Sequence, residues 1–171
     1  MINIYLIGMM GAGKSVTGKC LAGILGYAFV DLDVEIEKKE GRTISEIFSG
    51  KGEDYFRDVE TAVLKEFSAR DRHVFATGGG VVLRDENVRC MKATGKVVLL
   101  ETSLTVLWER ICQKKDRPLL NTPDPKGALE RILENRDARY MKASDLSVLT
   151  DGMNATAVAR RIAEQLRGSK S

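Results

Sequence analysis

Cysteine and histidine are scarce in this chain, which contains three cysteines and one histidine among 171 residues. Cys20, Cys90 and Cys112 show no paired spacing, and with His73 they do not form a zinc-binding pattern. Such sparse cysteine argues against a disulfide framework and is typical of proteins in a reducing compartment. We therefore expect a cytoplasmic protein.

Long hydrophobic runs and a strong excess of one charge are also missing. The apolar run at 2–7 is too short to cross a bilayer, and no basic segment or small-residue cleavage site beside it resembles a secretion signal. The formal net charge is only +3, without the basic stripe that is typical of nucleic-acid-binding proteins. We expect neither a membrane nor a nucleic acid as partner.

Proline is rare and concentrated in one place. The three prolines, Pro118, Pro123 and Pro125, all lie within 113–126, a segment with little apolar periodicity. A long irregular segment inside a compact domain is typical of a lid over a binding site. The remaining sequence, with 43% apolar residues overall, predicts one hydrophobic core and a single domain over 1–171.

Short apolar strands alternate with amphipathic helices along the chain. We predict strands at 2–7, 27–30, 73–76, 96–100 and 146–149, and helices at 14–25, 34–39, 43–48, 54–69, 86–92, 104–111, 127–140 and 155–166. This alternation predicts a five-stranded parallel sheet with helices on both faces, a three-layer α/β/α fold.

A phosphate-binding motif follows the first predicted strand. The sequence GMMGAGKS at 8–15 matches G-x-x-x-x-G-K-[ST] and leads directly into a predicted helix. In this motif the glycines let backbone N–H groups approach phosphate oxygens, and the helix N-terminus adds a favourable dipole. Lys14 is expected to reach the β- and γ-phosphates of a bound nucleotide, and Ser15 is expected to hold Mg²⁺. The fold class is therefore that of the P-loop nucleotide-binding proteins.

A regulatory GTPase would share this motif with a kinase. Such a switch needs a guanine-reading N-K-x-D sequence, whereas the nearest match, QKKD at 113–116, begins with Gln and follows an amphipathic helix. The third predicted strand leads into TGGG at 77–80 rather than D-x-x-G. These differences favour a kinase.

Two carboxylates follow the second predicted strand. Asp31 and Asp33 are two residues apart, so a continuing strand would direct both side chains to the same side. In a parallel sheet this end of the strand lies beside the phosphate loop. One carboxylate could then serve Mg²⁺ and the other an acceptor hydroxyl. The residues alone equally allow Asp33 to cap the following helix.

Two arginines indicate an anionic second substrate. Arg136 falls on the inward stripe of its predicted helix, and an unpaired charge there needs a buried partner or an anionic ligand. Arg57 borders an apolar helix face, where Glu60 could hold its guanidinium. If both converge on one cleft, their planar donors match a carboxylate. Structural ion pairs are the alternative for both residues.

Two further features could complete this site. Gly78, Gly79 and Gly80 end a predicted strand and could offer backbone N–H groups to the same ligand. Arg117 lies in the proline-rich segment and could close over the phosphates with the lid. An ordinary loop arginine is the alternative for Arg117.

These residues together resemble the shikimate kinase family. The resemblance extends over nearly the whole chain and depends on GMMGAGKS at 8–15, YAFVDLD at 27–33, GRTISEIF at 41–48, GEDYFRDVE at 52–60, ATGGG at 76–80, RPLL at 117–120, and Arg136 with Tyr140. It implies ATP- and Mg²⁺-dependent phosphorylation of a shikimate hydroxyl to shikimate 3-phosphate, in aromatic amino-acid biosynthesis. It also implies a monomer.

The resemblance also implies a role for each site residue. Shikimate would contact Asp33, Arg57, Gly79, Gly80 and Arg136, within a substrate-binding segment at about 33–60 and beyond it. ATP would contact Gly11, Ala12, Gly13, Lys14, Ser15, Val16, Arg110 near the adenine, and Arg117 from the lid. Mg²⁺ would be held by Ser15 and Asp31, and Asp33, Lys14 and Arg117 would be catalytic.

The chain departs from the family pattern at two positions. Ala138 stands where relatives often have proline, and Lys142 stands where they are often acidic. Arg139 lies close to the expected carboxylate ligand, but the inward stripe favours Arg136. A gluconate- or nucleoside-monophosphate-type kinase would share the phosphate loop and lid but should lack the set of Asp33, Arg57 and Arg136. A non-enzymatic nucleotide-binding module is a third alternative.

Overall fold

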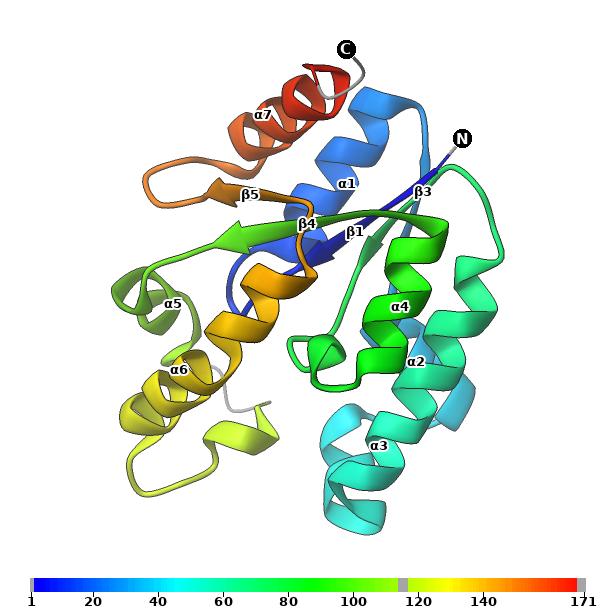
Figure 1. The fold of residues 1–171 in the computed structure, drawn as a ribbon. Coiled ribbons are helices and arrows are strands. Elements are labelled where there is room, and N and C mark those ends of the chain that lie inside the picture. The colour runs from blue at the N-terminus through cyan, green and yellow to red at the C-terminus, as the bar shows by residue number, and fades with distance from the viewer. Residues whose placement is uncertain (1, 114–116, 169–171) are drawn as a thin grey trace.

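The computed structural model describes residues 2–113 and 117–168 (Figure 1). Its strands are β1 (Asn3–Ile7), β2 (Ala28–Asp31), β3 (His73–Ala76), β4 (Gly95–Glu101) and β5 (Leu146–Leu149). They form one parallel sheet in the order β2-β3-β1-β4-β5. Every residue of β1 is buried, as expected for a central strand that is covered on both faces.

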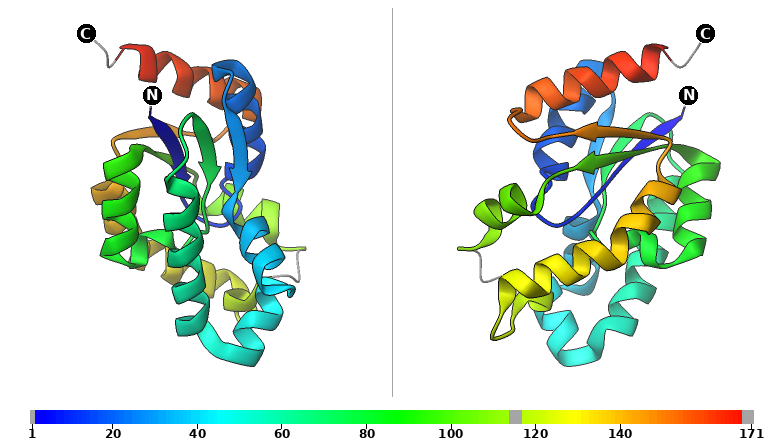
Figure 2. Two further views of the ribbon diagram at one scale, coloured as in Figure 1. Left: turned by 90° about the vertical axis from the view of Figure 1, so that its right-hand side faces the viewer. Right: turned by 60° about the vertical axis from the view of Figure 1, so that its left-hand side comes forward.

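Helices cover both faces of this sheet. They are α1 (Lys14–Leu25), α2 (Leu32–Glu40), α3 (Ile44–Ser68), α4 (Asp85–Thr94), α5 (Leu104–Ile111), α6 (Pro125–Ala143) and α7 (Ala155–Gly168). Helices α1 and α7 pack side by side on one face, and α4 and α6 lie against the other (Figures 1 and 2). The predicted three-layer α/β/α fold with a five-stranded parallel sheet is confirmed.

Most boundaries lie within two residues of the predicted ones, and the larger differences are in two helices. The helices predicted at 43–48 and 54–69 belong to one element, α3, which bends at Gly52, where φ is 83° and ψ is 173°. Thr43 begins α3 with a capping box, because its hydroxyl accepts from the Glu46 N–H while the Glu46 side chain accepts from the Thr43 N–H. The helix predicted at 127–140 begins earlier, at Pro125, and ends later, at Ala143.

Part of the predicted lid at 113–126 lies outside the described residues. The structure does not describe 114–116, which are the last three residues of the QKKD sequence at 113–116. The described part is more ordered than predicted. A 3₁₀ turn, η2 (Pro118–Leu120), packs against α6 and buries Leu120. No helix within the described ranges is long and apolar enough to span a bilayer.

The parallel arrangement brings three functional segments to one edge of the sheet. The carboxyl ends of β1, β2 and β3 lead into the phosphate loop, helix α2 and the segment 77–80, respectively. These strands are neighbours in the sheet, so the segments that follow them lie together. The fold thus places the phosphate motif beside both the paired aspartates and the glycine segment.

Candidate active site

The phosphate loop presents backbone donors at the N-terminus of α1. Gly11 and Gly13 adopt φ angles of 86° and 89°, which favour glycine. Within the described chain, the N–H groups of Gly11 and of residues 13–16 make no hydrogen bond to protein. These donors lie together at the positive end of a helix dipole, an arrangement that fits an anionic phosphate chain.

Lys14 is held inside this loop. Its Nζ donates to the carbonyl oxygens of Gly8 and Met9, at 2.7 and 2.9 Å. Burial lowers the pKa of Lys14 to about 8, with Asp33 acting in the opposite direction. In the absence of a phosphate partner, this group therefore loses its proton at a lower pH than an exposed lysine does.

The two aspartates reach the site in a different way from the one predicted. Asp31 ends β2 and caps α2, because its Oδ1 accepts from the N–H of Asp33 at 3.1 Å. Asp33 lies in the first turn of α2 rather than on a continuing strand, so the predicted strand alternation is wrong. The predicted alternative is also wrong, since the capping residue is Asp31. The other oxygen of Asp31 accepts from Ser15 Oγ at 2.5 Å, so strand β2 contacts the phosphate loop.

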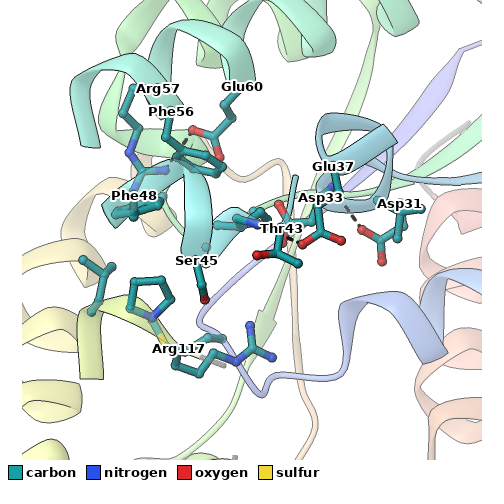
Figure 3. Close-up of a pocket in the computed structure, with 18 of the residues that line it drawn as sticks. Asp31, Asp33, Glu37, Thr43, Ser45, Phe48, Phe56, Arg57, Glu60 and Arg117 are labelled. Carbon is teal, nitrogen blue, oxygen red and sulfur yellow. Dashed lines mark hydrogen bonds and ion pairs between the residues drawn. The ribbon is translucent and has the colours of Figure 1, made fainter. Parts of the chain in front are cut away.

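Arg57 is buried, with a side chain that is 7% exposed, and contacts two carboxylates. Its Nη1 donates to Glu60, which is 1% exposed, and its Nη2 donates to Glu53, which is 46% exposed, each at 2.9 Å. The predicted Arg57–Glu60 contact is confirmed (Figure 3). Each of these buried charges needs the other as a close partner, because desolvation of an unpaired charge is costly.

The glycine segment shows where these groups converge. A Cβ atom added to Gly78 would lie 2.5 Å from Glu60 Oε1 and 3.0 Å from Asp33 Oδ1. One added to Gly80 would overlap the Arg57 guanidinium, and one added to Gly79 would lie 3.6 Å from Arg136 Nη1. The absence of side chains therefore lets four charged groups from three helices approach one backbone segment.

These groups line one cavity of about 520 Å³ beside the phosphate loop. Its lining includes Ser15, Asp31, Asp33, Arg57, Gly78, Gly79, Gly80, Arg117 and Arg136. The predicted convergence of Arg57 and Arg136 is confirmed, and the volume suits a small ligand. Arg117 enters across the cavity from Thr43 and Ser45 (Figure 3).

Two carboxylate oxygens in this cavity are buried without a partner among the described residues. They are Asp33 Oδ1 and Glu60 Oε1. Burial raises the pKa of Asp33, and the charge of Asp31 adds to the effect. Burial also raises the pKa of Glu60, with the Arg57 charge acting against it. A ligand or water molecule that donates to these oxygens would complete their hydrogen bonding.

Arg110 lies outside this cavity. It lines a separate hollow with Ala12, Gly13 and Val16, and its Nη1 donates to the Gly11 carbonyl at 3.1 Å. This hollow shares no lining residue with the cavity that holds Arg57. Of the residues predicted to contact ATP, Ala12, Gly13, Val16 and Arg110 line this second hollow, whereas Ser15 and Arg117 line the cavity that holds Arg57.

Several lining residues were given no role from the sequence. Thr43, Ser45, Phe48 and Phe56 come from both sides of the bend in α3 and line the same cavity. Phe48 and Phe56 lie with ring centroids 4.8 Å apart. The sequence GRTISEIF at 41–48 offered a signal, but no residue-level chemistry indicated where these side chains would point.

The three-layer fold, the phosphate loop and an adjoining cavity with both arginines and carboxylates define a P-loop small-molecule kinase. A shikimate kinase family model matches residues 10–167. The shikimate kinase of Thermodesulfovibrio yellowstonii is 45% identical, with 96% of this chain and 95% of the relative covered. That of Halorhodospira halophila is 44% identical, with 99% and 96% covered. The chain belongs to the shikimate kinase family.

Solved structures agree with this assignment. Shikimate kinase from Acinetobacter baumannii in complex with shikimate matches with a TM-score of 0.97 and 39% identity, over 99% of this chain and 95% of that one. A gluconokinase from Sinorhizobium meliloti matches with a TM-score of 0.59 and 21% identity, over 99% of this chain and 97% of that one. The gluconokinase shares the fold alone.

Proposed function

We propose that this protein transfers the γ-phosphate of ATP to a hydroxyl group of shikimate, giving shikimate 3-phosphate. The observation that carries the proposal is the placement of Arg57 and Arg136 in one cavity with Asp33, beside the phosphate loop. Membership of the shikimate kinase family supports the same substrate. The reaction is a step of aromatic amino-acid biosynthesis.

ATP binding is assigned to the phosphate loop and two arginines. The N–H groups of Gly11 and of residues 13–16 face the phosphates, and Lys14 exchanges its carbonyl partners for phosphate oxygens. Arg110 lies beside the adenine, and Arg117 contacts the phosphates from the predicted lid at 113–126. Positioning and charge neutralisation of this kind supply most of the catalysis in phosphoryl transfer.

Ser15 and Asp31 would hold Mg²⁺. Both offer oxygen atoms, the ligands that Mg²⁺ prefers, and their 2.5 Å contact places them together at the phosphate loop. A bound Mg²⁺ would neutralise part of the phosphate charge. No group of three His, Cys, Asp or Glu residues that could hold a metal occurs in the described part of the chain. Ser15 and Asp31 supply two oxygen ligands, so the ion would take its other ligands from phosphate and water.

Acceptor binding is assigned to groups around the glycine segment. The N–H groups of Gly79 and Gly80 have no hydrogen-bond partner within the described residues, so they are available to the shikimate carboxylate. Arg136 and Arg57 supply the charge. Glu53 is the half-exposed partner of Arg57. A ligand carboxylate therefore displaces the Arg57–Glu53 contact at a lower cost than the buried Arg57–Glu60 contact.

Asp33 accepts the proton or hydrogen bond of the attacking hydroxyl. Its raised pKa makes it a stronger base than an exposed aspartate, while Lys14 and Arg117 act to lower that pKa. Its unpartnered Oδ1 is available to the hydroxyl. Lys14 and Arg117 then stabilise the charge that develops on the transferred group.

The wider setting is also part of the proposal. The protein acts as a monomer of one domain over 1–171, with the segment at about 33–60 contributing to the acceptor pocket. The free cysteines Cys20, Cys90 and Cys112 fit a reducing cytoplasm.

A coupled ADP-release assay tests this function, with shikimate, gluconate and AMP supplied in parallel. Shikimate should support turnover, and the other two should leave only background ATP hydrolysis. Turnover with gluconate or AMP but not with shikimate would identify a gluconate- or nucleoside-monophosphate-type kinase instead. ATP binding without turnover on any acceptor would indicate a nucleotide-binding module. Lys14→Met should abolish turnover, because Lys14 is assigned to the phosphates of ATP. Lys19→Met, changed at an exposed lysine of α1, is its matched control.

A further inference from the structure

A buried phenol lies where the two substrate sites meet. Tyr140, on α6, is 2% exposed. Its hydroxyl lies 2.5 Å from the carbonyl oxygen of Gly79 and 3.5 Å from the sulfur of Met9 in the phosphate loop. One side chain therefore connects the acceptor-binding glycine segment with the nucleotide-binding loop.

The contact with Gly79 constrains a neighbouring donor. The Gly79 carbonyl and the Gly80 N–H belong to one planar trans peptide, so they point in opposite directions. No other described residue donates to the Gly79 carbonyl. When Tyr140 fixes that carbonyl, it also fixes the direction of the Gly80 N–H.

Arg136 lies one helical turn before Tyr140 on the same face of α6. Its Nη1 is 3.6 Å from the position of a Cβ added to Gly79. Burial raises the pKa of Tyr140, with the nearby Arg136 charge acting against it, so the phenol remains a neutral donor at neutral pH. Helix α6 thus presents two groups to the same peptide.

We propose that Tyr140 is a positioning residue for the acceptor, which aligns the Gly79–Gly80 peptide and the adjacent Arg136 before shikimate binds. It touches neither substrate and acts through these groups. The inference rests on the proposed shikimate kinase function, since it assigns the Gly80 N–H to the acceptor carboxylate.

The test is Tyr140→Phe, which removes the hydroxyl and keeps the ring. Removing one partner of a buried hydrogen bond and leaving the other unpaired weakens the aligned state, so KM for shikimate should rise roughly tenfold. KM for ATP should change less than about twofold, because the contact with the phosphate loop is through a weak sulfur acceptor. Calorimetric titration with shikimate should show the same weakening.

Tyr5→Phe is the matched control. Tyr5 is fully buried in β1, and its hydroxyl contacts Ser68 Oγ at 2.9 Å and Thr94 Oγ1 at 2.7 Å, outside the residues assigned to either substrate. This variant should lower the unfolding temperature and leave both KM values unchanged. Tyr140→Phe should differ from it by the selective change in shikimate KM.

Two results would overturn the inference. One is an unchanged KM for shikimate in Tyr140→Phe, and the other is an equal loss of affinity for both substrates with a lower unfolding temperature, which would indicate a structural role. Failure of the proposed function would look different, because the unmodified protein would then show no shikimate-dependent ADP release.

Discussion

The nucleotide side and the acceptor side of this protein are built in different ways. The phosphate loop takes its donors from one continuous segment, and they are backbone N–H groups at the start of α1. The acceptor cavity takes Asp33 from α2, Arg57 and Glu60 from α3, and Arg136 from α6, and these groups converge on the glycine segment 78–80. The first region depends on local conformation, and the second depends on tertiary packing. Substitutions should therefore affect the two regions differently.

The largest effect is expected for Arg57→Met. This change leaves Glu60 buried without its charged partner, which should cost about 3–5 kcal/mol in the free energy of unfolding. Shikimate affinity should fall as well. Urea denaturation and shikimate titration measure the two effects.

The double variant Arg57→Met/Glu60→Met separates stability from binding. It removes both charges and should recover much of the lost stability, but not the affinity for shikimate. Equal stability of Arg57→Met and the unmodified protein would mean that this pair does not stabilise the fold.

Asp33→Asn should lower turnover without weakening ATP binding. Loss of a positioned base should lower kcat by about a hundredfold or more, whereas KM for ATP should remain unchanged because Asp33 is assigned to the acceptor. Steady-state ADP release measures both constants. Asp71→Asn, at an exposed carboxylate, is the control. A kcat within about twofold of the unmodified value would remove Asp33 from the catalytic role.

The pH dependence tests the nucleotide side. The pKa of Lys14 is lowered to about 8, and the protonated form binds phosphate, so ATP affinity should fall above pH 8. In the nucleotide-free protein, the unfolded chain binds more protons than the folded chain between pH 8 and 10.5, so this group should make stability rise with pH across that window. Calorimetric titrations at pH 7 and pH 9, in buffers of different ionisation enthalpy, should show greater proton uptake at pH 9. Equal uptake at both values would contradict the assignment.

The smallest effect is expected for Arg110→Ala. Its exposed side chain makes one hydrogen bond to the Gly11 carbonyl, and a net contribution of about 1 kcal/mol corresponds to roughly a fivefold rise in KM for ATP. Shikimate KM should not change. Glu109→Ala, at the neighbouring exposed residue, controls for the helix. A larger change in KM for shikimate than in KM for ATP would contradict the assignment of Arg110 to ATP binding.

This contrast also explains how much the sequence could predict. The fold and phosphate loop were predictable because strand periodicity and the motif are local. The inward position of Arg136 followed from helical spacing. Asp33 lies in the expected cavity, but not because of the predicted strand alternation. The strand ends at Asp31 and the helix begins at Leu32, and three residues are too few for the sequence to distinguish a continuing strand from the start of a helix. The contact between Tyr140 and Gly79 could not be predicted, since 61 residues separate them in the chain.

The bend at Gly52 has a consequence for the shape of the acceptor cavity. Ser45 and Phe48 lie before the bend, Phe56 and Arg57 lie after it, and all four line the acceptor cavity, so the two arms of α3 form adjoining walls. The bend in α3 can be seen in Figure 2. No atom lies within 4 Å of a Cβ placed at Gly52, so the backbone conformation at φ 83°, rather than crowding, calls for glycine there. One pair of backbone torsions therefore sets the angle between two walls, and with it the width of the opening that a ring-shaped acceptor must enter.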